Sequence, residues 1–309
     1  MDETDIRLCQ MLFANSRTSV RELSDRLKIS VQATHRRMQR LKEEGVINRC
    51  VSFLSVEYLH TGRVYTSGRT EIDDYRELKK LLMKNDMVYV VLAASDNFLN
   101  ISFIPREMND LDAIASYLKK TIRIPNPLIS IESQVLFGGT VLNRRYSGPP
   151  ELSSVDYRVV HALRGDSRKA IEDIANELNL STRTVKRHLD RMIADGAIEF
   201  GLDWNPEYSP GITSLIMVKA KPGADLGRIR NQLNESFGGS LIFITSFVNP
   251  IDILGCYSWT PTVMRQKEVV REIGLVEGVD HTLSTLLQDG WVQETWRDRL
   301  LREKAGANK

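Results

Sequence analysis

One stretch of this sequence occurs twice, and the repeat limits how the chain can fold. The segment SVQATHRRMQRLKEEGVI at 30–47 aligns without a gap on STRTVKRHLDRMIADGAI at 181–198, so equivalent residues lie 151 positions apart. The same offset aligns Asp5-Ile6-Arg7 with Asp156-Tyr157-Arg158, and Ser16-Arg17 with Ser167-Arg168. Self-similarity at one constant offset indicates a duplicated unit. The 309 residues therefore divide into two related halves.

The first part of each half has the pattern of three short helices. In the first half, apolar residues recur at helical spacing over 5–12 and again over 20–27. A third helix is expected to begin after the N-cap Ser30 and to end at Gly45, because a Ser hydroxyl accepts from a free backbone N–H and Gly adopts the left-handed conformation of a helix end. Ser181 and Gly196 take the same places in the second half. Three helices followed by a strand predict a winged helix-turn-helix.

The second part of each half alternates strands and helices. In the first half we expect strands at 61–70, 88–94, 99–104 and 128–137, with helices at 72–83 and 108–118. In the second half we expect strands at 213–219, 241–247, 253–259 and 279–287, with helices at 226–237 and 262–273. Each β-α-β-β-α-β order predicts a ferredoxin-like sheet with both helices on one face. The other face is free to pack against a second sheet.

Together these patterns predict an α+β protein made of two winged helix-turn-helix domains, each followed by a ferredoxin-like βαββαβ domain. The winged helices are expected at 1–60 and 153–208, and the ferredoxin-like domains at 61–140 and 209–290. A linker rich in Gly and Pro is expected at 141–152, since these residues break regular structure. A C-terminal helical tail is expected at 291–309.

The third helix of each winged domain presents hydrogen-bond donors on its outer side. On a helical wheel Thr34, Met38 and Leu41 share the inner side, and Val185, Leu189 and Met192 do so in the second copy. Arg and Gln side chains can read base edges in the major groove, and additional Arg and Lys can bind phosphates. The alternative is a solvated helix face, as many charged runs are, but the pattern is kept in both copies. The predicted DNA-binding residues are Gln32, His35, Arg36, Arg40, Arg183, Lys186, Arg187 and Arg191.

The composition leaves this interpretation open and argues against some others. The formal net charge is +2, which excludes no class because nucleic-acid binders often confine their basic residues to one element. The acidic start MDETD is not a signal peptide, and no apolar run approaches the length of a membrane span. The three cysteines, Cys9, Cys50 and Cys256, are widely spaced and are expected to be reduced. We therefore expect a cytoplasmic protein without a membrane contact, a metal site or a cofactor.

The duplicated pattern resembles the Lrp/AsnC (feast/famine) transcription regulators of bacteria and archaea. The residues that carry the resemblance are the Asp5-Ile-Arg-Leu start, the Leu23-Ser-Asp-Arg-Leu segment and the stretch from Ser30 to Ile47, with their counterparts from Asp156 to Ile198. The resemblance implies an N-terminal winged helix that binds double-stranded DNA, and a ferredoxin-like domain of the RAM type that dimerises and often binds an amino acid. Family members usually carry one set of these domains, and this chain carries two.

The resemblance places an effector site in the turn between the second and third strands of each ferredoxin-like domain. The family usually has a Gly-containing turn followed by Asp. The first copy here has no Gly, with Asn97 in place of the Asp, and the second keeps the Asp but lacks the Gly. Turns that merely build the sheet are the alternative. The candidate effector-binding residues are Ser95, Asp96, Asn97, Asn249 and Asp252.

An enzyme is the competing class, because the chain also resembles sirohaem decarboxylases, some of which have the same two-part, Lrp-like architecture. Such chemistry would need His, Tyr or Arg around a tetrapyrrole. Of the five histidines, His35 and His188 lie on the third helices and His161 on a first helix, while His60 and His281 lie near the sheets without a recognisable constellation. No catalytic residues can be assigned from this pattern. The sequence therefore predicts a regulator and not an enzyme.

The duplication leaves two assemblies open. The two sheet domains could pair within one chain and form a fused pseudo-dimer that reads an asymmetric site. Alternatively, two chains could form a homodimer in which first pairs with first and second with second, presenting four winged helices. We prefer the homodimer, because the segment 137–154 is long enough to separate the halves and closed two-fold dimers are common.

Overall fold

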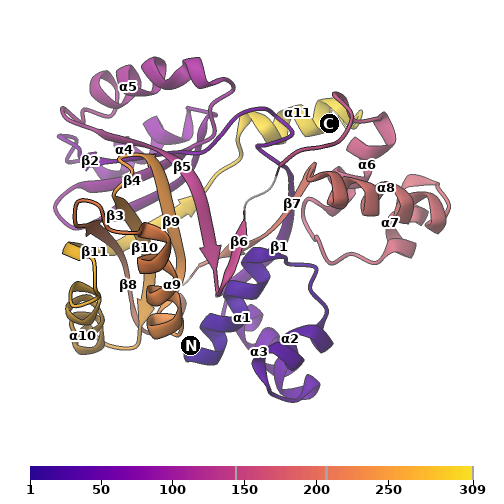
Figure 1. Cartoon of the computed structure of the whole chain (residues 1–309). Helices are drawn as coiled ribbons and strands as arrows, with labels where there is room; N and C mark the ends of the chain where they lie inside the picture. Colours follow the sequence, from indigo (N-terminus) through magenta and orange to yellow (C-terminus); the bar gives the residue numbers. More distant parts are fainter. Residues whose placement is uncertain (143–144, 206–207, 308–309) are drawn as a thin grey trace.

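A computed structural model describes residues 1–142, 145–205 and 208–307 of the chain. It shows two three-helix domains beside one large sheet structure (Figure 1). The first winged helix consists of α1 (Glu3–Ala14), α2 (Val20–Leu27), α3 (Val31–Glu43) and the strand β1 (Ile47–Leu54). The second consists of α6 (Ser154–Leu163), α7 (Ile171–Leu178), α8 (Thr182–Asp195) and β7 (Ile198–Trp204). Both predicted winged helix-turn-helix folds are confirmed.

The predicted ends of the third helices are confirmed in both copies. The Ser30 hydroxyl accepts from the Ala33 N–H at 3.1 Å, and Gly45 has the left-handed φ of +77°. The Ser181 hydroxyl accepts from the Thr184 N–H at 3.1 Å, and Gly196 caps α8 with φ +74°. The inner-side residues are buried as expected: Thr34, Met38 and Leu41 on α3, and Val185, Leu189 and Met192 on α8.

Each ferredoxin-like domain has the predicted order of elements. The first contains β2 (Val64–Arg69), α4 (Tyr75–Met83), β3 (Val88–Ala94), β4 (Phe98–Phe103), the short 3₁₀ helix η1 (Met108–Asp110), α5 (Leu111–Lys120) and β5 (Leu128–Phe137). The second contains β8 (Ile212–Ala220), α9 (Leu226–Phe237), β9 (Leu241–Asn249), β10 (Ile253–Thr260), α10 (Val263–Gly274) and β11 (Val279–Val292). Each helix pair buries its apolar side on the outer face of its own strands, as Leu82 and Leu118 do in the first domain.

The two sheets join into one closed barrel. Following the hydrogen-bonded neighbours gives the order β2-β4-β3-β11-β8-β10-β9-β5, and β5 pairs again with β2. Closure depends on the long strands: the first part of β11 pairs with β8 and the remainder, from Leu287 to Val292, pairs with β3. Likewise β5 pairs first with β2 and then with β9. Full closure leaves no unpaired edge among these eight strands.

The two winged helices meet across an approximate two-fold axis. Their strands β1 and β7 pair antiparallel, with Cys50 opposite Leu202. The Ser16 and Ser167 hydroxyls, which are equivalent in the repeat, lie 2.6 Å apart. Arg168 donates to the carbonyl oxygens of Ser16 and Thr18, at 2.6 and 2.7 Å, and Arg17 donates in the same manner to those of Ser167 and Lys169. These reciprocal contacts hold the two winged helices together within one chain.

The preferred assembly, in which first sheet pairs with first and second with second, is corrected by this arrangement. The first and second sheets pair with each other inside the chain, so the strand edges that such a homodimer would use are occupied. The cause is the length of β11, which was expected to end at residue 287 and continues through Val292 to reach β3. The chain is a fused pseudo-dimer. Association of two chains through another surface stays a prediction.

Smaller differences concern the ends of elements. The helix expected at 72–83 begins at Tyr75, because Asp74 caps it by accepting from the backbone N–H groups of Arg76 and Glu77. The expected linker at 141–152 begins inside a strand, β6 (Thr140–Leu142), which pairs with β5. Residues 143–144 of this linker lie outside the described residues.

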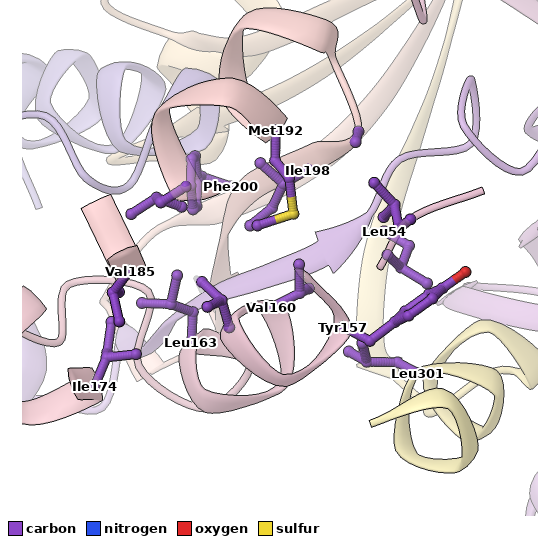
Figure 2. Packing of buried hydrophobic residues seen from close by; sticks show 14 of the residues in the cluster. Leu54, Tyr157, Val160, Leu163, Ile174, Val185, Met192, Ile198, Phe200 and Leu301 are labelled. Atoms are coloured by element: carbon purple, nitrogen blue, oxygen red, sulfur yellow. The ribbon is translucent and has the colours of Figure 1, made fainter. Parts of the chain in front are cut away.

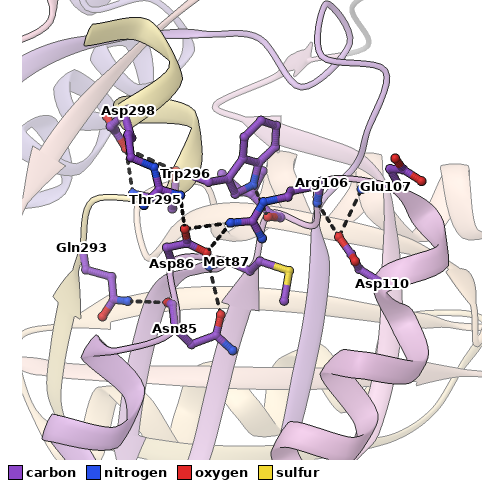
Figure 3. A network of polar contacts seen from close by, with 12 residues as sticks. Asn85, Asp86, Met87, Arg106, Glu107, Asp110, Gln293, Thr295, Trp296 and Asp298 are labelled. Atoms are coloured by element: carbon purple, nitrogen blue, oxygen red, sulfur yellow. Dashed lines mark hydrogen bonds and ion pairs between the residues drawn. The ribbon is translucent and has the colours of Figure 1, made fainter. Parts of the chain in front are cut away.

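The C-terminal tail is part of the fold. Its helix α11 (Trp296–Lys304) lies beside α6, and Leu301 is buried in the core of the second winged helix (Figure 2). Leu54 from β1 of the first winged helix enters the same core. The start of the tail is fixed to the first ferredoxin-like domain: the Trp296 indole donates to Ile104 O at 2.7 Å, and its backbone N–H donates to Asp86 O at 2.8 Å (Figure 3).

Candidate nucleic-acid interface and interior cavity

The exposed side of α3 carries three of the predicted DNA-binding residues. Gln32, His35 and Arg36 are all exposed. Among the described residues none of the three has a side-chain hydrogen bond or ion pair. They point from a helix whose opposite side is anchored by Met38 and Leu41 in the core. The geometry therefore leaves an amide, an imidazole and a guanidinium available to an external partner.

Arg40, the fourth predicted residue of α3, has an internal role. It donates to Asp5 Oδ2 at 2.6 Å, and Arg37 donates to Asp5 Oδ1 at 2.7 Å. Asp5 is fully buried at the start of α1, so these contacts supply the partners that a buried carboxylate requires. Arg40 is still 42% exposed along its side chain. It holds α3 against α1, and its exposed part can contribute positive charge.

The second helix repeats this arrangement with different residues. Arg183, Lys186 and Arg187 are exposed on α8. Lys186 is paired with Asp190 one turn later, whereas Arg183 and Arg187 have no such pair among the described residues. Arg191, the remaining predicted residue, binds the fully buried Asp156. Contact of these side chains with DNA stays a prediction.

Asp156 is the centre of a buried polar cluster that matches the one around Asp5. Burial alone would raise the pKa of Asp156, but hydrogen bonds from Ser153 and His188 and the charge of Arg191 lower it below its usual value. His188 Nδ1 lies 2.7 Å from Asp156 Oδ1. His188 therefore takes the place of Arg37, and Arg191 that of Arg40. Sequence reasoning missed both carboxylates, although their matched positions in the repeat were visible.

The candidate effector turns lie at the surface. Ser95, Asp96 and Asn97 are exposed in the β3–β4 turn, where Asp96 pairs with Arg69 and Asn97 donates to Asp73 at 3.1 Å. In the β9–β10 turn Asn249 is exposed and Asp252 pairs with Lys219. None of these residues lines the cavity inside the barrel. Effector binding at the turns stays a prediction.

A cavity of about 440 Å³ lies inside the barrel. Its walls come from both ferredoxin-like domains, and Phe53 of β1, Trp204 of β7 and Phe13 of α1 contribute from the winged helices. Aromatic side chains from both domains form part of the lining. The edge-to-face pair Tyr65–Phe247 has ring centroids 5.8 Å apart, and Phe243 stacks on Tyr257 at 5.3 Å. Pockets of this size and lining are typical of small-molecule sites.

Several polar groups in this cavity have no partner. Within the described part of the chain, Asn100 Nδ2, Ser102 Oγ and Thr245 Oγ1 are buried without a hydrogen bond. Leaving such a group unsatisfied costs roughly 1–3 kcal/mol, so native structures contain few of them. Asn100 and Ser102 lie on β4 of the first domain, and Thr245 lies on β9 of the second. Sequence periodicity identified these positions as strand residues but could not show that both strands line the same cavity.

Among the described residues, four charged side chains line the cavity. Arg63 binds Glu132 at 3.2 Å and also binds Glu199. Burial would lower the pKa of Arg63, but Glu199 and Glu132 outweigh it and raise the pKa. Glu57 lines the cavity as well, and Arg297 lies behind the wall, 3.9 Å from Glu199. Burial raises the pKa of Tyr65 and Tyr89, so both phenols stay protonated at neutral pH.

Comparison with known proteins agrees with the duplicated architecture. Residues 1–48 and 152–199 each match the winged helix-turn-helix DNA-binding family. The HTH-type transcriptional regulator LysM of Sulfurisphaera tokodaii is 25% identical over 142 residues, which covers 46% of this chain and 98% of that regulator. LysM of Saccharolobus solfataricus is 23% identical over 145 residues, covering 47% and 99%. The repeated match agrees with a tandem duplicate whose halves are similar to Lrp/AsnC-type regulators.

The chain as a whole also resembles a solved enzyme. The crystal structure of the siroheme decarboxylase NirDL covers 99% of both chains with a TM-score of 0.60 at 12% identity. NirDL in complex with an iron-uroporphyrin III analogue gives a TM-score of 0.61 at 12% identity over 100% of both chains. At this identity the likeness shows a shared fold.

The prediction that the chain is not an enzyme is wrong, because it excluded a class of protein to which a structure of the same architecture belongs. It was based on histidines that form no recognisable constellation, and NirDL shows that the same complete architecture serves catalysis. In this chain His60 and His281 are exposed, and no histidine among the described residues lines the cavity. The described residues contain no group of three or more metal-binding side chains. Within the same described ranges, no helix is both long and apolar enough to cross a membrane.

Proposed function

We propose that this protein binds double-stranded DNA as a single unit with two different recognition helices, and regulates transcription through that binding. The observation that carries the proposal is the pairing, within one chain, of two winged helices whose recognition helices carry different residues. At equivalent repeat positions Gln32 corresponds to Arg183, His35 to Lys186 and Arg36 to Arg187. The β1–β7 pairing and the Ser16–Ser167 contact fix these two helices relative to each other.

Different donors favour different bases. A Gln amide pairs in bidentate fashion with adenine, and an Arg guanidinium pairs with guanine. Gln32 on α3 and Arg183 on α8 would therefore prefer different bases at matching places in the two half-sites. Two recognition helices normally enter successive major grooves about 34–36 Å apart. The proposed operator is accordingly an asymmetric site with two unlike halves.

Arg40 and Arg191 have a different part in this proposal. Their contacts with the buried Asp5 and Asp156 orient the recognition helices. Their exposed portions would add charge toward phosphates and would carry no base information. Substituting them would therefore affect stability as well as DNA affinity, whereas Arg36 and Arg187 would affect affinity alone.

The proposal is tested by selecting bound sequences from a random DNA pool and measuring affinity for the selected site. Arg36→Ala and Arg187→Ala should each weaken binding by roughly 1–3 kcal/mol if the side chain reads a base. Arg228→Ala is the charge-matched control, because Arg228 is exposed on α9 of the second ferredoxin-like domain. Wild-type affinity in both recognition-helix variants would refute the placement.

Modulation by a small effector belongs to the same proposal. Polar residues at the β3–β4 and β9–β10 turns, Asn97 and Asp252 among them, are the sites that family resemblance suggests for an amino acid. A bound ligand raises the melting temperature because it stabilises only the folded state. Thermal-shift measurements with each amino acid at millimolar concentration test this. The absence of any shift would leave the turns with a structural role.

Decarboxylation of a tetrapyrrole is the second candidate function. The full-length likeness to NirDL favours it, since both halves of that enzyme align with both halves of this chain. The test is to incubate the purified protein with sirohaem without oxygen and to follow the masses of the products. Loss of carbon dioxide from the tetrapyrrole would establish the enzyme. An unchanged tetrapyrrole spectrum and mass would leave DNA binding as the function.

A further inference from the structure

Two arginine side chains meet where the two winged helices contact each other. Arg17 and Arg168 are equivalent in the repeat, and they lie in the loops before α2 and α7. Both are half-buried, and each guanidinium donates through Nη1 to two backbone carbonyl oxygens of the opposite loop. Arginine carries further N–H donors on Nε and Nη2. On both side chains these nitrogens have no hydrogen bond among the described residues, so they are available to a ligand.

The charges of these two arginines are not neutralised by direct ion pairs. Among the described residues, neither guanidinium forms an ion pair with a carboxylate, and Lys169 in the same loop is held by Glu177. Burial and the charge of Arg168 lower the pKa of Arg17, although the charge of Asp166 acts in the opposite direction. The surroundings therefore oppose the positive charge of Arg17, and an added anion would be favourable there.

The two loops lie on the axis that relates the recognition helices. The approximate two-fold axis exchanges α3 and α8 and passes beside the contact between Ser16 and Ser167. Strand β1 lines the barrel cavity through Phe53, and Figure 1 shows β1 and β7 between the barrel and the helices α2 and α7. Duplex DNA that receives α3 and α8 in successive major grooves turns its minor groove toward this axis at the midpoint. Phosphates that flank the central minor groove would lie nearest to the arginine pair.

We infer that Arg17 and Arg168 together bind backbone phosphates of the DNA at the centre of the operator, between the two half-sites. The inference rests on the proposed DNA binding and adds a contact that reads no base. Guanidinium groups suit this contact because they bind phosphate oxygens through charge-assisted hydrogen bonds. The pair differs from Arg40 and Arg191, whose charges are engaged by buried carboxylates.

The repeat supplies two variants that change the charge beside the arginine pair and keep the local structure. Asn15 and Asp166 are equivalent, and each side chain accepts from the backbone N–H two residues later, at 3.0 Å from Arg17 and 2.9 Å from Arg168. Exchanging the amide and the carboxylate therefore keeps this hydrogen bond. Asp166→Asn should tighten binding to the selected DNA site by about twofold to tenfold, and Asn15→Asp should weaken it by a similar factor.

Two controls separate this effect from general charge and from stability. Asp112→Asn makes the same change of charge at the exposed start of α5 on the barrel, and it should alter DNA affinity much less. Asp166 attracts Arg17 in the free protein, so Asp166→Asn should leave the melting temperature equal or slightly lower while DNA binding tightens. A purely structural role of the arginine pair predicts no gain in affinity.

Neutral methylphosphonates in place of the central phosphates locate the contact on the DNA. They should weaken wild-type binding, and on this DNA the advantage of Asp166→Asn should largely disappear. Methylphosphonates outside both half-sites are the control. Failure of the wild-type protein to bind any selected sequence would overturn the proposed function together with this inference. Tight wild-type binding combined with unchanged affinity in Asp166→Asn, or with unchanged affinity for the central methylphosphonate DNA, would overturn this inference alone.

Discussion

The two winged helices have the same internal structure but are attached to the barrel in different ways. The first lies directly on the second ferredoxin-like domain: Ile6 packs with Ile242 and Trp259, and the Gln10 amide donates to Gly238 O at 2.9 Å and to Leu241 O. The second winged helix packs instead against the C-terminal helix α11, through Tyr157 and Leu301 (Figure 2). The difference shows how a duplicated unit adapts to two environments.

The repeat positions identify where the two copies diverged. Ile6 corresponds to Tyr157, Gln10 to His161 and Phe13 to Arg164. Each residue fits its own surroundings: Phe13 stacks on Phe137, whereas Arg164 binds Asp298 at 3.0 Å and also Glu294 in the tail. In contrast, the buried carboxylates Asp5 and Asp156 and the Ser caps of the third helices are the same in both copies. The first helix of each copy thus differs where it contacts the rest of the molecule, and it keeps the buried carboxylate that contacts its own third helix.

The largest expected effect comes from removing the contact between the tail and the second winged helix. Leu301→Ala leaves a cavity in that core and should cost roughly 2–5 kcal/mol of unfolding free energy. Hydrogen exchange should show faster opening of α6, α7 and α8 and unchanged protection in α1, α2 and α3. The control is Arg299→Ala, which removes a largely exposed ion pair with Asp86 and should cost less than about 1 kcal/mol. Equal loss of protection in both winged helices would contradict separate attachments.

A pair of substitutions at equivalent positions sharpens the comparison. Gln10→Ala leaves two buried carbonyl oxygens without their donor and should cost roughly 1–3 kcal/mol. His161→Ala, at the matching position of α6, removes a half-buried ring with no side-chain hydrogen bond among the described residues and should cost clearly less. Urea denaturation gives both values. A larger cost for His161→Ala would show that α6 depends on this position as α1 does.

The smallest expected effect is a pH dependence confined to the second winged helix. Burial and the charge of Arg164 lower the pKa of His161 below its usual value. The unfolded state therefore binds a proton before the folded state does, so the second winged helix should lose stability as the pH falls below about 6.5. The first has Gln10 in this place and should not respond.

Hydrogen exchange of each winged helix at pH 7.5 and pH 5.5 measures this dependence, and His161→Gln should remove it. A further loss is expected only in stronger acid, as Asp156 becomes protonated, because its folded-state pKa is lowered and its stabilising contribution disappears as the pH falls through that value. An equal response of the first winged helix at pH 5.5 would contradict the assignment to His161.

The sequence predicted the elements of this fold better than their association. Caps and stops such as Ser30 and Gly196 act within one turn of helix, so their effect could be predicted locally. The closure of the barrel depends on the pairing of β11 with β3, which joins residues far apart in the sequence and has no local signal. The internal partner of Arg40 was missed for the same reason, because an outward position on a helical wheel does not show which neighbouring helix lies beside it.

The candidate sites also differ in whether a local sequence pattern could predict them. Exposure of Gln32 and Arg36 follows from helical periodicity and was predicted. The cavity was not, since Asn100 and Thr245 belong to different halves and face the same space only after the barrel closes. The preference for a homodimer through the sheets had the same origin: sequence alone does not show that the two halves satisfy each other.

The central claim is that one chain reads two unlike half-sites with two unlike helices. Hydroxyl-radical footprinting of the selected DNA site with wild-type protein, Arg36→Ala and Arg187→Ala tests it most directly. We expect an asymmetric wild-type footprint, with Arg36→Ala losing protection in one half-site and Arg187→Ala losing it in the other. A palindromic footprint in which both variants weaken the same positions equally would contradict the claim.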